Sequence, residues 1–80
     1  MAQKALAKSE IDYTLLKAAI LGDTVSRIAR KTGMEEKAAR QQLEALRASR
    51  LVDKNKRQEG IYYYVTGRGE RFMTDYESKL

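Results

Sequence analysis

The side chains in this sequence that could do chemistry are mainly cationic. Sixteen lysines and arginines stand against eleven aspartates and glutamates, which gives a net charge of +5 over 80 residues. Histidine and cysteine are absent, and this excludes imidazole bases, thiolate nucleophiles, disulfides and zinc sites built on those residues. The lysines, tyrosines, serines and acids show no spacing that would assemble a catalytic group. We therefore expect a binding protein and not an enzyme, without cofactor, metal or small-molecule ligand.

The positive charge is concentrated in the middle of the sequence. Residues 24–50 carry seven basic and three acidic side chains, and residues 51–69 carry four basic and two acidic ones. Such a field attracts polyanions such as nucleic acids or anionic membranes. The longest apolar run, residues 18–21, is too short to span a membrane, and the N-terminus has no signal-peptide pattern. We expect a cytoplasmic protein with no membrane partner.

The basic residues of the segment 24–50 must be positioned by helices. Apolar residues at helical spacing predict one helix over residues 9–22, with Ser9 as its N-cap. Thr24 is expected to cap a second, short helix over residues 25–31, and Gly33 is expected to end it. A tight turn at Gly33 would join the second helix to the one that follows.

A longer helix and a hairpin follow. The third helix is predicted over residues 35–50, with acidic residues at its start and basic residues at its end, as the helix dipole favours. Its inward positions are Ala39, Leu43 and Leu46. Residues 51–54 and 61–65 are rich in β-branched and aromatic side chains and predict a β-hairpin with a basic, polar tip. Thr66 is then expected to cap a last helix over residues 67–80.

Three segments, in this order and spacing, resemble a winged helix-turn-helix domain. Residues 24–34 resemble the helix and turn of the family, and residues 43–52 resemble a recognition helix that runs into the wing. Residues 63–69 are similar to the tyrosine-leucine-threonine-x-x-glycine signature of small bacterial and archaeal regulators. Arg50 stands where the family often has glycine. The expected fold is α+β and mainly helical, with three helices, a wing and a C-terminal helix over residues 9–80, after a flexible tail at residues 1–8.

The resemblance implies sequence-specific binding of double-stranded DNA by a small transcriptional regulator of archaeal, archaeal-viral or bacterial type. The recognition helix, residues 35–50, would enter the major groove, and the wing, residues 51–65, would lie on the backbone or minor groove. The expected recognition-helix contacts are Glu36, Lys37, Arg40, Gln41, Glu44 and Arg47. The expected wing and backbone contacts are Ser26, Arg27, Arg30, Lys54, Lys56, Arg57 and Gln58.

Other interpretations of the same residues stay open. The basic helix face could be a solvated surface supported by a pair such as Glu36 with Arg40, and the basic hairpin could be an edge that discourages strand pairing between molecules. Winged helices also serve as protein-interaction modules. In a transcription or translation assembly, Glu35 and Glu36 would then contact a basic partner.

The C-terminal helix carries an apolar stripe that is large for so small a core. We expect a homodimer formed through this helix, because small regulators of the resembled type pair through terminal helices. The expected dimer residues are Phe72, Tyr76, Leu80, Tyr13 and Leu16. The alternative is that the stripe covers only the core of its own chain.

Overall fold

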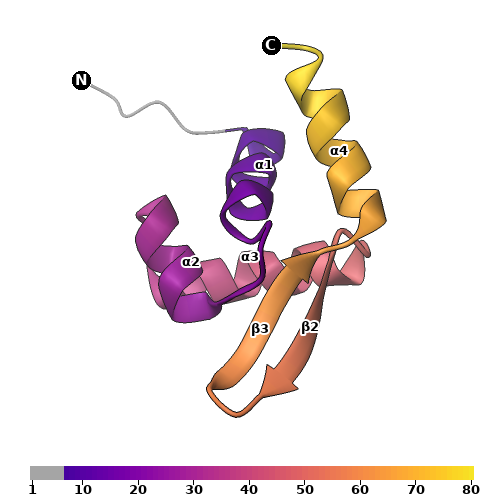
Figure 1. Cartoon of the computed structure of the whole chain (residues 1–80). Helices are drawn as coiled ribbons and strands as arrows, with labels where there is room; N and C mark the ends of the chain where they lie inside the picture. The colour runs from indigo at the N-terminus through magenta and orange to yellow at the C-terminus, as the bar shows by residue number, and fades with distance from the viewer. Residues whose placement is uncertain (1–6) are drawn as a thin grey trace, which may run out of the picture.

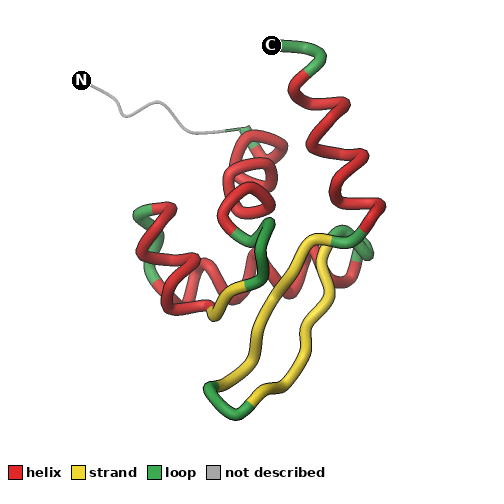
Figure 2. Tube along the Cα trace, viewed as in Figure 1, coloured by secondary structure: helices red, strands yellow, loops and turns green. Residues whose placement is uncertain are grey.

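The computed structural model describes residues 7–80, and Figure 1 shows their arrangement. The predicted flexible tail falls mostly on residues 1–6, which lie outside the described residues. In chain order the elements are α1 (Lys8–Ala18), β1 (Asp23–Thr24), α2 (Val25–Thr32), α3 (Glu36–Ala48), β2 (Val52–Arg57), β3 (Gly60–Val65) and α4 (Gly67–Glu77). Figure 2 shows helices as the larger part of the trace. The mainly helical α+β prediction is confirmed.

The first two helices differ in how their N-termini are capped. α1 begins at Lys8, and its N-cap Ala7 makes no side-chain cap bond, so the prediction that Ser9 caps the helix is wrong. For α2 the prediction is confirmed, since the Thr24 hydroxyl accepts a bond from the Arg27 amide (3.4 Å). Gly33 ends α2 with φ of 72°, a left-handed conformation that glycine adopts readily.

The sheet has three antiparallel strands in the order β1-β3-β2. The hairpin register runs from Val52 opposite Val65 to Arg57 opposite Gly60, so its strands extend into residues 55–60, which the sequence predicted as a loop. Those residues are polar because both faces of the wing tip meet solvent, while backbone pairing continues without apolar side chains. Figure 1 shows the hairpin projecting away from the helices.

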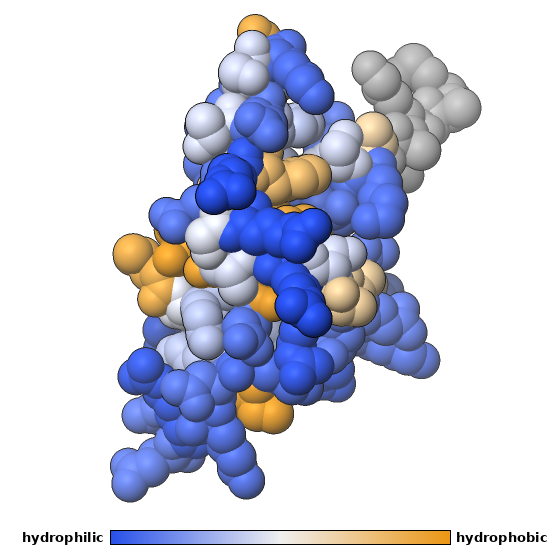
Figure 3. All heavy atoms as spheres, turned by 90° about the vertical axis from the view of Figure 1, so that its right-hand side faces the viewer, coloured by the Kyte–Doolittle hydropathy of each residue, from blue (hydrophilic) through white to orange (hydrophobic). Residues whose placement is uncertain are grey.

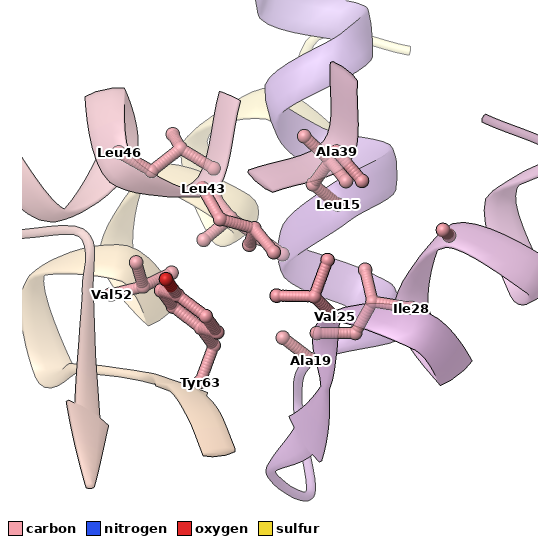
Figure 4. Close-up of a cluster of buried hydrophobic side chains, with 11 residues drawn as sticks. Leu15, Ala19, Val25, Ile28, Ala39, Leu43, Leu46, Val52 and Tyr63 are labelled. Carbon is pink, nitrogen blue, oxygen red and sulfur yellow. The ribbon is translucent and has the colours of Figure 1, made fainter. Parts of the chain in front are cut away.

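The core lies between α1, α2, α3 and the base of the hairpin (Figure 4). Its buried side chains are Leu15, Leu16, Ala19, Val25, Ile28, Ala29, Ala39, Leu43, Leu46, Val52 and Tyr63. The three predicted inward positions of α3 are therefore confirmed. Leu16 is fully buried, because it shares the inner face of α1 with Leu15, and its placement at a dimer surface is wrong.

The junction of the wing and α4 is tightly packed. The Thr66 hydroxyl donates to the Arg50 carbonyl (2.7 Å) and accepts from the Gly69 amide (3.1 Å), which caps α4 as predicted. Arg50 has φ of 66°, a left-handed backbone that explains why glycine is common there in the resembled family. Phe72 and Met73 of α4 are half-buried and pack against the core.

Candidate nucleic-acid interface

α2, α3 and the wing together border a groove of about 420 Å³. Its lining includes Thr24, Ser26, Glu36, Arg40, Ile61 and Tyr63. These residues come from β1 and the start of α2, the first turns of α3, and β3. The fold therefore brings the helix-turn-helix segment and the wing to one surface, on which Arg40 meets Ile61 although the two lie 21 residues apart in the sequence.

The outer face of α3 presents Lys37, Arg40 and Gln41, all exposed. Glu36 accepts a bond from the Ser26 hydroxyl (2.9 Å), and one of its carboxylate oxygens lies 3.7 Å from Arg40 Nη2. The side chain of Arg40 keeps 59% of its surface exposed in this pair, so the pair is a loose surface contact. Arg40 can therefore still reach a ligand at the groove.

Glu44 does not project from α3 as predicted. Its Oε2 accepts from the Tyr63 hydroxyl of β3 (2.5 Å) and from Lys54 Nζ of β2 (2.9 Å). The hydrogen bond from Tyr63, followed by that from Lys54, holds the pKa of Glu44 below its ordinary value. Burial, reinforced by Glu44, raises the pKa of Tyr63 to about 12. Glu44 and Lys54 therefore hold each other in the structure, and their contacts with DNA stay predictions.

Arg47 forms a second bridge from α3 to the wing. It lies 3.5 Å from a Glu44 carboxylate oxygen and 3.8 Å from an Asp53 oxygen. Both contacts are long, and the Arg47 side chain remains 44% exposed. Arg47 therefore faces the wing base, two turns beyond Arg40 on the same side of α3.

Asp23 was not predicted as a site residue, yet it organises the cations of α2. Its carboxylate is buried and accepts from the Thr24 amide (2.9 Å), while Lys31 Nζ lies 2.9 Å away and Arg27 Nε 4.0 Å away. Burial opposes ionisation, but the bonds from Lys31 and Thr24 outweigh it and lower the pKa of Asp23. A single acidic residue just before Thr24 gave no sequence signal for this cluster.

The wing tip is cationic and exposed. Lys56, Arg57 and Gln58 all lie on its surface. The Arg57 guanidinium sits 5.4 Å from the centre of the Tyr62 ring, in cation–π range. Within residues 7–80, no carboxylate lies within 4.0 Å of the Lys37, Arg30, Lys56 or Arg57 side-chain nitrogens, since the ion pairs of that part of the chain involve other residues. These four positive charges are uncancelled by close pairing.

The predicted dimer residues lie around α1 and α4. The rings of Tyr13 and Tyr76 stack within the chain at 4.5 Å between centroids, and the Tyr13 hydroxyl donates to Glu77 (2.6 Å). Leu80 is 85% exposed. A shallow groove beside it is lined by Ser9, Phe72, Asp75, Tyr76, Lys79 and Leu80. Figure 3, seen from the α4 side, shows a largely hydrophilic surface with small, separated apolar patches.

Comparisons with known proteins agree with this architecture. No family model matches the sequence, and no curated protein matches it. Among solved structures, the chain is similar to Sso10a-2, a DNA-binding protein from Sulfolobus solfataricus, with a TM-score of 0.83, 18% identity, and coverage of 91% of this chain and 77% of that one.

Two longer proteins are also similar. BpsR of Bordetella bronchiseptica, whose DNA binding is regulated by 6-hydroxynicotinic acid, matches with a TM-score of 0.75 and 15% identity over 88% of this chain. The transcriptional regulator BldR from Sulfolobus solfataricus matches with a TM-score of 0.75 and 17% identity over 82% of this chain. The chain spans about half the length of each, 52% and 50%. At these identities the likeness establishes the fold, which is the winged helix-turn-helix.

Proposed function

We propose that this protein binds double-stranded DNA and acts as a transcriptional regulator. α3 enters the major groove, and the wing lies on the backbone or minor groove. The observation that carries the proposal is that Arg40 lines the groove between α3 and the wing, while the same two elements carry further exposed cations: Lys37 on α3, and Lys56 and Arg57 at the wing tip. Lys37, Lys56 and Arg57 have no close acidic partner among the described residues, so all three are available to phosphates.

The exposed side chains of α3 and the wing tip suit two kinds of DNA contact, with base edges and with phosphates. Arg40 can donate two bonds to the O6 and N7 of guanine, and Gln41 can pair with the N6 and N7 of adenine. Lys37 and the wing-tip residues Lys56 and Arg57 suit phosphates, which position the protein without reading sequence. The remaining proposed contacts lie beside these residues: Ser26, Arg27 and Arg30 on α2, Gln58 at the wing tip, and Glu36 on α3. Arg40 and Gln41 are thus the proposed source of sequence preference.

Similar structures support the same function. Sso10a-2 is a DNA-binding protein, BldR is a transcriptional regulator, and the DNA binding of BpsR is regulated by a small acid. This protein shares their fold and adds an uncancelled cationic surface on the elements that this fold uses to contact DNA. Both points favour a DNA-binding regulator over an enzyme or a protein-interaction module.

The direct test is fluorescence anisotropy of a labelled random duplex over a salt series. About five phosphate contacts predict a slope of log K against log salt of about −4 to −5. The variant K37Q/K56Q/R57Q should lower the magnitude of this slope by about 3, because each contact contributes about 0.9. The control R68Q/R71Q/K79Q removes the same charge at the C-terminal helix and should leave most of the slope. Absence of binding at low salt contradicts the proposal and favours the protein-interaction alternative.

We also propose that two copies pair through the C-terminal half of α4. The surface that remains, after Tyr13 and Tyr76 stack within the chain, is Leu80 with the exposed edges of Phe72 and Tyr76 beside the groove. Two copies would place two recognition helices on half-sites about 10 base pairs apart. Specificity would rise because both half-sites must match at once.

A further inference from the structure

The carboxylate of Glu44 joins α3 to both strands of the wing. It stands on α3 and accepts hydrogen bonds from one residue of each wing strand, Lys54 on β2 and Tyr63 on β3. Lys54 Nζ also lies 5.9 Å from the centre of the Tyr63 ring, within cation–π range. α3 and the wing are therefore tied at one point by an ionised, partly buried contact.

Burial makes this contact different from the pair of Glu36 with Arg40 on the same helix. Tyr63 is only 3% exposed, and its hydroxyl would lose its bonding partner if Glu44 moved away. The Lys54 side chain is 33% exposed, whereas the Arg40 side chain in its pair with Glu36 is 59% exposed. A charge-assisted bond with a partly buried partner holds more firmly than an exposed pair. Lys54 should thus remain on Glu44 when DNA approaches.

We propose that Glu44 is a positioning residue that fixes the wing to α3 through Tyr63 and withholds Lys54 from DNA, so that the wing contacts phosphates only through its tip. The inference rests on the proposed DNA binding. It assigns different roles to two lysines that are two residues apart on the same strand and look equivalent in the sequence. Lys54 is part of the scaffold, and Lys56 contacts the ligand.

The first test compares K54Q with K56Q in the anisotropy assay. At about 0.1 M salt, loss of one phosphate contact weakens binding about eightfold and lowers the magnitude of the salt slope by about 0.9. We expect this result for K56Q, and less than a twofold change with an unaltered slope for K54Q. Equal losses for the two variants would overturn the inference. If the parent protein does not bind DNA at all, the proposed function fails instead.

The second test repeats K54Q in two backgrounds that each remove one negative charge from α3. In E44Q the released Lys54 can reach phosphate, so K54Q should now weaken binding about eightfold and reduce the slope by about 0.9. In E36Q, which makes the same charge change away from the wing, K54Q should stay silent. A silent K54Q in both backgrounds, or a loss in both, would refute the role of Glu44. If E44Q does not fold, the comparison of K54Q with K56Q in the parent protein decides alone.

Discussion

Addition of a single methyl group at Gly69 should lower the free energy of unfolding. A Cβ placed there would lie 2.1 Å from the Leu51 carbonyl oxygen and 2.7 Å from Val65 Cγ1. The first of these atoms belongs to the backbone and cannot move aside by a rotamer change. The same carbonyl accepts from the Thr66 amide (3.1 Å). Relief of the clash must therefore separate α4 from the turn between α3 and β2.

The expected magnitude follows from two opposing effects of Gly69→Ala. Alanine in a helix is favoured over glycine by about 1 kcal/mol. Overpacking a rigid site costs about 1–3 kcal/mol or more, and here the strained contact is with backbone and also disturbs the Thr66 cap, which contributes about 1 kcal/mol. We expect a net loss of about 2 kcal/mol in the free energy of unfolding. For a domain of this size, that loss lowers Tm by about 8–16 °C.

Gly67→Ala is the matched control, two residues earlier in α4. A Cβ at Gly67 meets no atom within 4 Å, so the substitution should be neutral or stabilising by up to about 1 kcal/mol. Urea unfolding of both variants, followed by circular dichroism, measures the difference. If Gly69→Ala is as stable as the parent protein or as Gly67→Ala, the close packing at the Leu51 carbonyl is refuted.

Three further predictions concern charge, assembly and recognition. Because the pKa of Asp23 is lowered, its pair with Lys31 stabilises the fold above about pH 4, and this stabilisation is lost as the pH falls through the lowered pKa. The loss of stability caused by D23N, measured by urea unfolding, should therefore be large at neutral pH and smaller near pH 3. Equal losses at the two pH values would contradict this role of Asp23. Leu80→Glu should shift light scattering from twice the 9.1 kDa chain mass to one, whereas a monomeric parent protein would remove the dimer proposal. Arg40→Ala should cost about 1–3 kcal/mol on a preferred duplex only, and Lys56→Ala should weaken all duplexes alike; equal losses on random and preferred DNA would deny Arg40 a role in base reading.

The local signals of the sequence predicted much of the fold. Thr24, Gly33 and Thr66 act where caps and a left-handed turn were expected, because these effects depend on a few neighbouring residues. The period of the apolar residues placed Ala39 and Leu43 in the core. Gly69, matched in the sequence only as part of a signature, has its physical reason in the contact with Leu51.

The parts that could not be predicted depend on contacts between distant residues. β1 is two residues long and exists only because Asp23 and Thr24 meet Tyr63 and Tyr62 of β3. Glu44 was read as an outward side chain from helical spacing alone, yet the wing folds back over it and supplies two donors. Leu16 was predicted at a dimer surface, but it is fully buried because the core meets α1 on a wider face. Periodicity gives the direction of a side chain but not what the rest of the chain places there.

The most direct test of the DNA-binding proposal is an amide chemical-shift titration of the labelled protein with a short duplex. We predict that the shifts concentrate on the first turns of α3, the start of α2 and the wing tip around Lys56 and Arg57, while the outer face of α4 stays unchanged. Shifts confined to α4, or the absence of shifts at low salt, would contradict the assignment of the groove between α3 and the wing as the DNA-binding surface.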